Sequence, residues 1–262
     1  MCLIVLALGV HPRFPMVLAA NRDEFFARPA ALAATWTDLP QITGGRDLEK
    51  GGAWLATSAR GAFAAVTNFR DPAQRHPNPR SRGALVADFL AGAVSAANYV
   101  QAAVDQGDRY DGFNLIAGDD SGVWYGSNRG GGLSRLPPGI HGLSNHLLGT
   151  AWPKVRRATA AVTAALELPD DAIEVAMLNA LADDAAASDA ELPNTGVGLE
   201  WERRLAPAFI RGTAYGTRCS TVVVADADGR GTLTERTFGI DGHVVATLRI
   251  PVSLRVDTGQ QR

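Results

Sequence analysis

The second residue of the chain, Cys2, is the residue best suited to covalent chemistry. A cysteine attacks a carbonyl as its thiolate, and an ordinary thiol pKa of about 8.5 leaves only a small fraction ionised at neutral pH. Removal of Met1, which the small side chain at position 2 permits, would give Cys2 its own α-amine, with a pKa of about 7.7 to 8.0. That amine is suited to accept the thiol proton, so that nucleophile and base would share one residue. The alternative is that Cys2 is simply a small apolar side chain at the start of a buried strand.

Other familiar chemistries lack their usual sequence patterns. The chain contains no HExxH, CxxC, GxxxxGKS/T, GxGxxG or GxSxG motif, which removes the usual support for metal, nucleotide and serine-hydrolase sites. The histidines are predicted to lie in loops or at strand edges, at His11, His76, His141, His146 and His243. We therefore expect no metal and no cofactor.

The composition indicates a soluble globular chain that can bury a sizeable core. The chain has 262 residues, 46% of them hydrophobic, and 25 basic against 27 acidic side chains. A sequence pI of about 6.2 argues against a nucleic-acid partner, which calls for a basic face. No apolar run approaches the roughly 18 residues of a membrane helix. The chain has only two cysteines, Cys2 and Cys219, and so low a number is common in proteins of the reducing cytosol. We therefore expect a cytoplasmic protein. The oligomeric state is left open.

Two predicted β-hairpins position the candidate groups. They span residues 2–20 and 53–67, where short apolar runs flank turn-rich segments. The polar segment 21–24 is predicted as the exit from the first hairpin, and Asn68 stands at the end of the second. Residues 69–82, rich in Arg, Pro and Asn, predict an exposed loop.

The remaining elements predict one α+β domain over residues 1–262. Helical composition marks residues 83–90, 93–104, 153–166 and 170–181. Apolar and β-branched runs predict strands at residues 113–117, 123–125, 220–225, 231–237 and 243–250. Residues 183–200 are predicted as an acidic loop, and residues 258–262 as a frayed tail. Hairpins followed by helix pairs favour layered sheets and helices.

Eight segments of the chain match, in order, the motifs of a known family. They are MC at 1–2, NRDE at 21–24, GGRDLEKGGAWLA at 44–56, AAVTNFRDP at 64–72, FNLIAGD at 113–119, GLSN at 142–145, WPKV at 152–155 and YGTRCSTV at 215–222. The sequence thereby resembles the NRDE-motif family, also called the transport and Golgi organisation protein 2 family. That family is similar in turn to the N-terminal-nucleophile hydrolases of the choloylglycine hydrolase and penicillin V acylase group.

The resemblance implies a fold and a set of site residues. The fold it implies is a four-layer αββα sandwich of the N-terminal-nucleophile hydrolase type. Cys2 corresponds to the nucleophile of those hydrolases, and Asn68 to an asparagine that donates to the oxyanion. Asn145, in a Ser-Asn pair, and Arg218, just before a strand, match two further site residues of the hydrolases.

The charged partners of Cys2 are implied less directly. The hydrolases carry an arginine and an aspartate separated by two residues, whereas Arg22, Asp23 and Glu24 are contiguous here. Asp23 is expected to hydrogen-bond the α-amine, with Glu24 as the alternative. Arg22 and Arg218 are expected to lower the thiol pKa by their positive charge.

The function implied by the resemblance is that of a cysteine amidohydrolase. Such an enzyme would cleave the C–N amide bond of a small acylated molecule through an acyl-thioester on Cys2. One alternative is a non-catalytic carrier of a hydrophobic or haem-like ligand on the same scaffold, although no histidine lies in a motif suited to bind haem. A second alternative is a structural protein, for which Cys2→Ser and Asn68→Ala would change nothing measurable.

Overall fold

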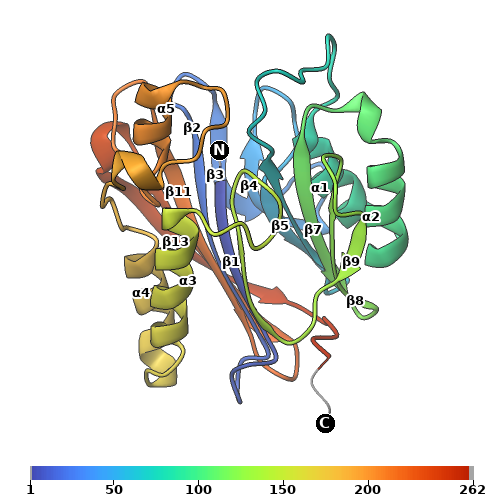
Figure 1. Ribbon diagram of the computed structural model, residues 1–262. Helices are drawn as coiled ribbons and strands as arrows, with labels where there is room; N and C mark the ends of the chain where they lie inside the picture. The colour runs from blue at the N-terminus through green and yellow to red at the C-terminus, as the bar shows by residue number, and fades with distance from the viewer. Residues whose placement is uncertain (1, 260–262) are drawn as a thin grey trace.

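The computed structural model describes residues 2–259, which form two antiparallel sheets between two layers of helices (Figure 1). The six-stranded sheet has the order β10 (Gly139–Leu143), β1 (Cys2–Leu8), β2 (Met16–Phe25), β11 (Tyr215–Ala225), β12 (Arg230–Phe238) and β13 (Val244–Ser253). The seven-stranded sheet runs through β3 (Ala30–Thr35), β4 (Ile42–Asp47), β5 (Leu55–Ser58), β6 (Phe63–Asn68), β7 (Phe113–Asp119), β8 (Gly122–Ser127) and β9 (Leu133–Arg135). Helices α3 (Pro153–Ala165) and α4 (Asp170–Ala180) cover the first sheet, and α1 (Arg82–Ala91) and α2 (Ala96–Asp105) cover the second. The predicted α+β, four-layer αββα sandwich is confirmed.

Apolar side chains fill the three spaces between these four layers. Strand β1 shows how the sequence achieves this, because successive side chains of a strand point to opposite faces. Ile4, Leu6 and Leu8 pack between the two sheets. Leu3 and Val5 pack against the helix layer of α3 and α4. A strand buried on both faces is a continuous apolar run, which is why the first hairpin could be predicted from its composition.

Most of the predicted helices and strands are present, and the missed ones have weak local signals. Helix α3 begins with Pro153, and α4 begins with two acidic residues that favour a helix N-terminus. Strands β3 and β4 were not predicted, because their sequences AALAAT and ITGGRD are rich in Ala and Gly. The predicted loop 183–200 leads into a short helix, α5 (Leu199–Leu205). None of the helices within the described part of the chain is long and apolar enough to cross a membrane.

The segment 21–24 is an interior part of β2, and its prediction as a polar exit was wrong. Strand β2 pairs with β1 on one side and with β11 on the other, so its backbone bonding continues through these polar residues. Asn21, Arg22 and Asp23 are buried. Alternation along the strand turns Asn21 and Asp23 toward the helices and Arg22 into the space between the sheets.

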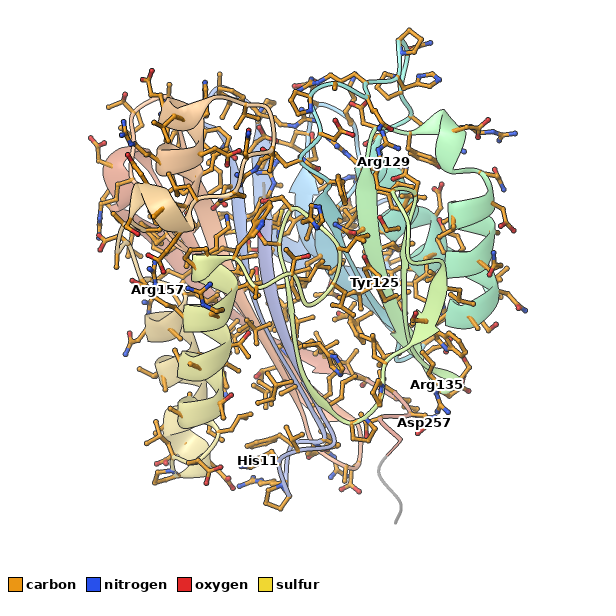
Figure 2. The ribbon with its side chains drawn as sticks, in the orientation of Figure 1. His11, Tyr125, Arg129, Arg135, Arg157 and Asp257 are labelled. Carbon is orange, nitrogen blue, oxygen red and sulfur yellow. The ribbon has the colours of Figure 1, made fainter. Side chains whose placement is uncertain are left out.

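The C-terminal segment crosses from the six-stranded sheet to the seven-stranded sheet. The N–H of Arg255 donates to the carbonyl of Gly61 at 2.7 Å. Arg135 and Asp257 form an ion pair at 2.7 Å at the same corner of the molecule (Figure 2). Within the tail that was expected to fray, Thr258 is buried. Met1 and residues 260–262 lie outside the described residues.

Asn21→Ala is expected to lower the free energy of unfolding by about 3 kcal/mol, because it leaves buried polar groups without their partners. Asn21 Nδ2 donates to the carbonyls of Leu181 and Ala208, both at 2.8 Å, and its Oδ1 accepts from Ser220 Oγ at 2.6 Å. Urea denaturation followed by circular dichroism measures this loss. Val175→Ala, at an exposed position of α4, is the control and should cost less than about 0.5 kcal/mol. A loss at Asn21 as small as the control's would contradict the expectation.

Candidate active site

Four of the predicted site residues line one pocket where β1 begins and β6 ends. The pocket has a volume of about 270 Å³, and its lining includes Cys2, Arg22, Asp23 and Asn68, together with Glu24. It is termed the Cys2 pocket below. Cys2 opens β1 and lies opposite Arg22 on β2, whereas Asn68 closes β6 in the other sheet. Stacking of the two sheets therefore brings together groups that are far apart in the sequence.

Cys2 is a neutral thiol in this environment. Cys2 is 9% exposed, and this burial raises the pKa of its thiol. The positive charge of Arg22 acts to lower the same pKa. The backbone of Cys2 is held by Ser144, whose Oγ donates to the Cys2 carbonyl at 3.0 Å. A nucleophile of this kind needs a neighbouring base to remove its proton.

Arg22 carries a buried positive charge beside Cys2. Its Nη2 lies 3.9 Å from Asp47 Oδ2, and its guanidinium lies over the ring of Trp54 at 4.8 Å from the centroid. Within residues 2–259, Arg22 Nη1 is buried and has no hydrogen-bond partner. In the described part of the chain, Arg22 therefore carries an unsatisfied buried donor beside Cys2.

Asp23 is the buried member of the two acidic candidates. It is 1% exposed, and its Oδ1 accepts from Thr217 Oγ1 at 2.8 Å. Burial raises the pKa of Asp23, while the charge of Lys154 and the Thr217 hydrogen bond act to lower it. Glu24 instead lies at the rim, where its Oε2 is 3.9 Å from Arg28 Nε. The buried position favours Asp23 over Glu24 as a partner for an amine at Cys2.

Lys154 was not singled out from the sequence, although it lies in the WPKV segment. It is 1% exposed and occupies the first turn of α3, where its Nζ donates to the carbonyl of Leu205 at 3.0 Å. Burial lowers the pKa of Lys154 to about 8, and Asp23 opposes this shift. Its proximity to Asp23 comes from the packing of α3 on the sheet, which no local sequence signal shows.

A buried ion pair adds further charge behind Asp23. Arg70 Nη1 lies 2.5 Å from Glu202 Oε2, and both side chains are buried. The guanidinium of Arg70 lies over the ring of Trp152, 4.7 Å from its centroid. Despite this concentration of charge, no group of three or more His, Cys, Asp or Glu side chains between residues 2 and 259 is placed to hold a metal ion.

Asn145 lies behind Asn68 and outside the lining of the Cys2 pocket. It is fully buried, and its Nδ2 donates to the backbone carbonyl of Asn68 at 3.0 Å. The carbonyl of Asn145 accepts from the N–H of Arg70 at 2.7 Å. Asn145 therefore fixes the backbone at the end of β6, whereas the Asn68 residue itself lines the pocket.

Arg218 is also placed outside the lining of the Cys2 pocket. It sits in β11 at a register irregularity between Thr217 and Cys219, rather than before the strand as expected. Its Nη1 donates to the carbonyls of Phe25 at 2.9 Å and Arg28 at 3.0 Å. A bulge changes the direction of a side chain. Arg218 accordingly hydrogen-bonds the backbone at and just after the end of β2 and does not line the pocket that contains the thiol.

Cys219, the second cysteine, is in a different environment from Cys2. It is 3% exposed and lies across β2 from Cys2, since both residues pair with Arg22. Burial raises the pKa of the Cys219 thiol well above its ordinary value, and the nearby Glu235 raises it further. Cys219 is therefore a protonated core thiol.

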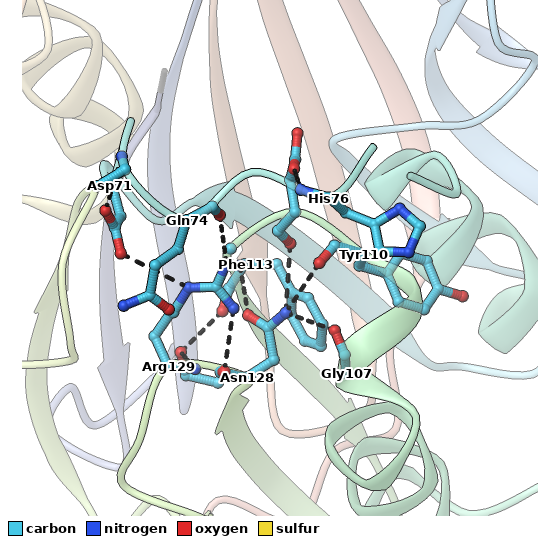
Figure 3. A network of polar contacts seen from close by, with 12 residues as sticks. Asp71, Gln74, His76, Gly107, Tyr110, Phe113, Asn128 and Arg129 are labelled. Atoms are coloured by element: carbon cyan, nitrogen blue, oxygen red, sulfur yellow. Dashed lines mark hydrogen bonds and ion pairs between the residues drawn. The ribbon is translucent and has the colours of Figure 1, made fainter. Parts of the chain in front are cut away.

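The loop between β6 and α1 forms the rim of the pocket and is held by a network of hydrogen bonds (Figure 3). Arg129 Nη2 donates to the carbonyl of Gln74 at 2.8 Å. The N–H of His76 donates to Asp111 Oδ1 at 2.9 Å. The loop predicted at residues 69–82 is thus exposed at its tip but anchored to the seven-stranded sheet.

Comparisons with known proteins agree with this architecture. The family model described as Transport and Golgi organisation 2 matches residues 1–239. The chain is 39% identical over 265 residues to the Transport and Golgi organization protein 2 homolog of Bos taurus, covering 91% of this chain and 93% of that one. It is 36% identical over 262 residues to the Homo sapiens homolog, with the same coverage of 91% and 93%.

Among solved structures, the N-acylethanolamine-hydrolyzing acid amidase ortholog of Caenorhabditis elegans has a TM-score of 0.50 at 12% identity, covering 85% of this chain and 92% of that one. Identity this low supports the fold alone. The expected N-terminal-nucleophile hydrolase fold is thus confirmed. On its sequence matches, the chain belongs to the Transport and Golgi organisation 2 family.

Proposed function

We propose that the protein is an N-terminal cysteine amidohydrolase that cleaves the C–N amide bond of a small acylated molecule. The observation that carries the proposal is the pocket that Cys2 shares with Arg22, Asp23 and Asn68. The likeness to a solved amidase supports only the scaffold. The chemistry therefore rests on these four residues and their surroundings.

Burial raises the pKa of the Cys2 thiol, so the proposed mechanism needs a base to remove its proton. A buried neutral thiol does not attack by itself, and removal of Met1 would place an α-amine on the same residue. In the first step the thiol proton passes to this amine while sulfur bonds to the amide carbon. The proton then moves to the leaving nitrogen as the C–N bond breaks, leaving an acyl-thioester. Water, deprotonated by the same amine, releases the acid and restores the thiol.

Asn68 is the group that would stabilise the oxyanion formed in the first step. A neutral amide aimed at the developing charge contributes more in the transition state than in the ground state. Asn145 supports this role indirectly, because its hydrogen bond to the Asn68 carbonyl holds the end of β6 in place. Asn145 is accordingly a positioning residue.

The buried charges support separate proposed roles for Asp23 and Arg22. Lys154 favours the ionised form of Asp23, which is the form that accepts a hydrogen bond from an α-amine. Arg22 favours the thiolate over the thiol, and its Nη1 has no partner among residues 2–259. Both groups would thus orient the reacting residue without forming a bond to the substrate.

p-Nitrophenyl acetate is expected to transfer one acetyl group to Cys2, seen as a burst of nitrophenolate and an acetyl adduct mapped by mass spectrometry. Asn68→Ala should slow this acylation about 100-fold, because it removes an oxyanion donor. Alkylation of Cys2 by iodoacetamide should be unchanged in Asn68→Ala, since that reaction forms no oxyanion. Cys2→Ser should lose the acyl-thioester.

Asn78→Ala, at the exposed tip of the loop, is the matched control and should react like the wild type. Full acylation in Asn68→Ala would contradict the assigned role of Asn68. Absence of any acyl-thioester on Cys2 would contradict the proposal itself and would favour a non-catalytic carrier of a hydrophobic or haem-like ligand.

The buried Lys154 is expected to make stability depend on pH. Its pKa is lowered from 10.5 to about 8 in the folded chain, so between these values the unfolded chain binds more protons at this residue. The contribution of Lys154 to the free energy of unfolding should therefore rise with pH across this window. The measurement is the difference in unfolding free energy between wild type and Lys154→Met, determined by urea denaturation at both ends of the window. Lys50→Met, which replaces the exposed lysine, is the control and should show no such rise. If the difference in unfolding free energy between wild type and Lys154→Met is the same at both pH values, the lowered pKa of Lys154 is refuted.

A further inference from the structure

The irregularity in β11 decides which residue of that strand faces Asp23. Cys219 pairs with Arg22, and a regular antiparallel register would therefore place Arg218 opposite Asp23. Instead, Thr217 pairs with Asp23, because β11 accommodates Arg218 as one extra residue. A threonine hydroxyl thus stands beside Asp23 where a regular strand would place an arginine.

The hydroxyl of Thr217 is held between a donor and an acceptor. The backbone N–H of Ile210 donates to Thr217 Oγ1 at 2.9 Å, and Thr217 Oγ1 donates to Asp23 Oδ1 at 2.8 Å. A backbone N–H acts only as a donor, and a hydroxyl carries one hydrogen. The bond from Ile210 therefore makes the hydroxyl an acceptor on that side and directs its hydrogen to Asp23.

The backbone of Thr217 is also fixed to the connector of residues 206–214, which joins α5 to β11. The N–H of Thr217 donates to the carbonyl of Ile210 at 2.9 Å, so two hydrogen bonds join the two residues. Thr217 is fully buried, and Ile210 is buried in a small apolar cluster with Leu205 and Tyr215. A β-branched side chain held at both its backbone and its hydroxyl has little rotational freedom. The packing of the connector therefore sets the direction of the Thr217 hydroxyl.

Two other buried polar side chains are bound by the end of α5 and by the connector. Lys154 Nζ donates to the carbonyl of Leu205 at 3.0 Å, and Asn21 Nδ2 donates to the carbonyl of Ala208 at 2.8 Å. Helix α5 and the start of β1 lie at the same end of the six-stranded sheet (Figure 1). The connector thus holds the polar groups of this part of the sheet in one arrangement.

Charged and titratable groups from several elements also act on Asp23. Burial raises the pKa of Asp23, and the charges of Lys154 on α3 and Arg70 after β6 act to lower it. The charge of Asp23 in turn raises the pKa values of Cys2 on β1 and Tyr215 on β11, which burial already raises. These interactions act through charge, and charge alone does not fix the direction in which a carboxylate turns.

We propose that Thr217 is a positioning residue whose hydroxyl, oriented by the N–H of Ile210, turns Asp23 toward the α-amine of Cys2. The proposal rests on the proposed function, in which this amine accepts the thiol proton. Thr217 itself forms no bond to the substrate and acts only through Asp23. Its hydrogen bond supplies the direction that the surrounding charges do not.

Thr217→Val tests the hydroxyl, because valine has nearly the shape of threonine without its hydrogen bonds. It should raise the pKa of Asp23 by about 1, since the lost hydrogen bond favours the ionised carboxylate. Carbon-13 NMR titration of the Asp23 carboxyl, whose signal is absent from Asp23→Asn, measures this change. Thr217→Ser keeps the hydroxyl and should keep the wild-type pKa. Thr221→Val is the matched control and should also keep it, because Thr221 Oγ1 donates to a different buried carboxylate, Glu235 Oε2, at 3.1 Å on the same strand.

The rate of Cys2 alkylation by iodoacetamide near neutral pH, mapped by mass spectrometry, tests whether Thr217 acts through Asp23. Thr217→Val should slow this reaction about tenfold, because an amine that Asp23 does not orient accepts the thiol proton less readily. Thr217→Ser should restore the rate. In the Asp23→Ala background, Thr217→Val should cause no further loss, whereas a merely structural role would add its own loss.

An unchanged pKa of Asp23 in Thr217→Val would overturn the inference, as would a further loss of rate when Thr217→Val is added to Asp23→Ala. If circular dichroism shows that Thr217→Val does not fold, Thr217→Ala carries the same expectations. A raised pKa of Asp23 in the variant, together with a wild-type Cys2 that forms no acyl-thioester, would contradict the proposed function while leaving the action of Thr217 on Asp23 in place.

Discussion

The pairing of β1 with β2 is the constraint on which the site depends. It sets Cys2 opposite Arg22, and because side chains alternate along a strand, it also turns Asp23 to the helix side of the same sheet. A shift of one residue would exchange the two faces and would remove the thiol from the space between the sheets. The same shift would exchange Ile4, Leu6 and Leu8, which pack between the sheets, with Leu3 and Val5, which pack against the helices. Core packing and site geometry are therefore set by the same pairing.

Burial makes the charged form of each ionisable group in the site costly in free energy. Desolvation raises the pKa values of Cys2 and Asp23 and lowers that of Lys154. In each case burial disfavours the charged form of the side chain. Opposite charges offset part of this cost, because Lys154 favours ionised Asp23. The Arg70–Glu202 pair nearby is subject to the same balance. A buried charged cluster of this kind lowers folding stability relative to an apolar core. The proposed role of these groups in orienting a nucleophile is a physical reason for the protein to retain the cluster.

The sequence predicted the parts of the site that have local signals and missed those that arise from packing. The hairpin of β1 and β2 followed from apolar runs, and the family motifs led to Cys2, Asn68 and Asp23, which the structure brings to one pocket. The polarity of residues 21–24 suggested the exit from the first hairpin, because local patterning does not show that β2 continues there and is paired on both sides. Arg218 was expected just before a strand, but it lies inside β11, which begins at Tyr215, and next to a register irregularity that no local sequence pattern indicates. The position of Lys154 depends on how α3 packs on the sheet, which a single sequence does not specify.

The central claim is that Cys2, with a free α-amine, is a nucleophile activated by its surroundings. The intact mass of the purified chain, recorded before and after exposure to a thiol-directed acylating reagent near neutral pH, tests it most directly. The account predicts a chain that lacks Met1 and gains a single acyl group, mapped to Cys2 and not to Cys219. A chain that retains Met1 and whose Cys2 reacts no faster than an ordinary thiol would contradict it.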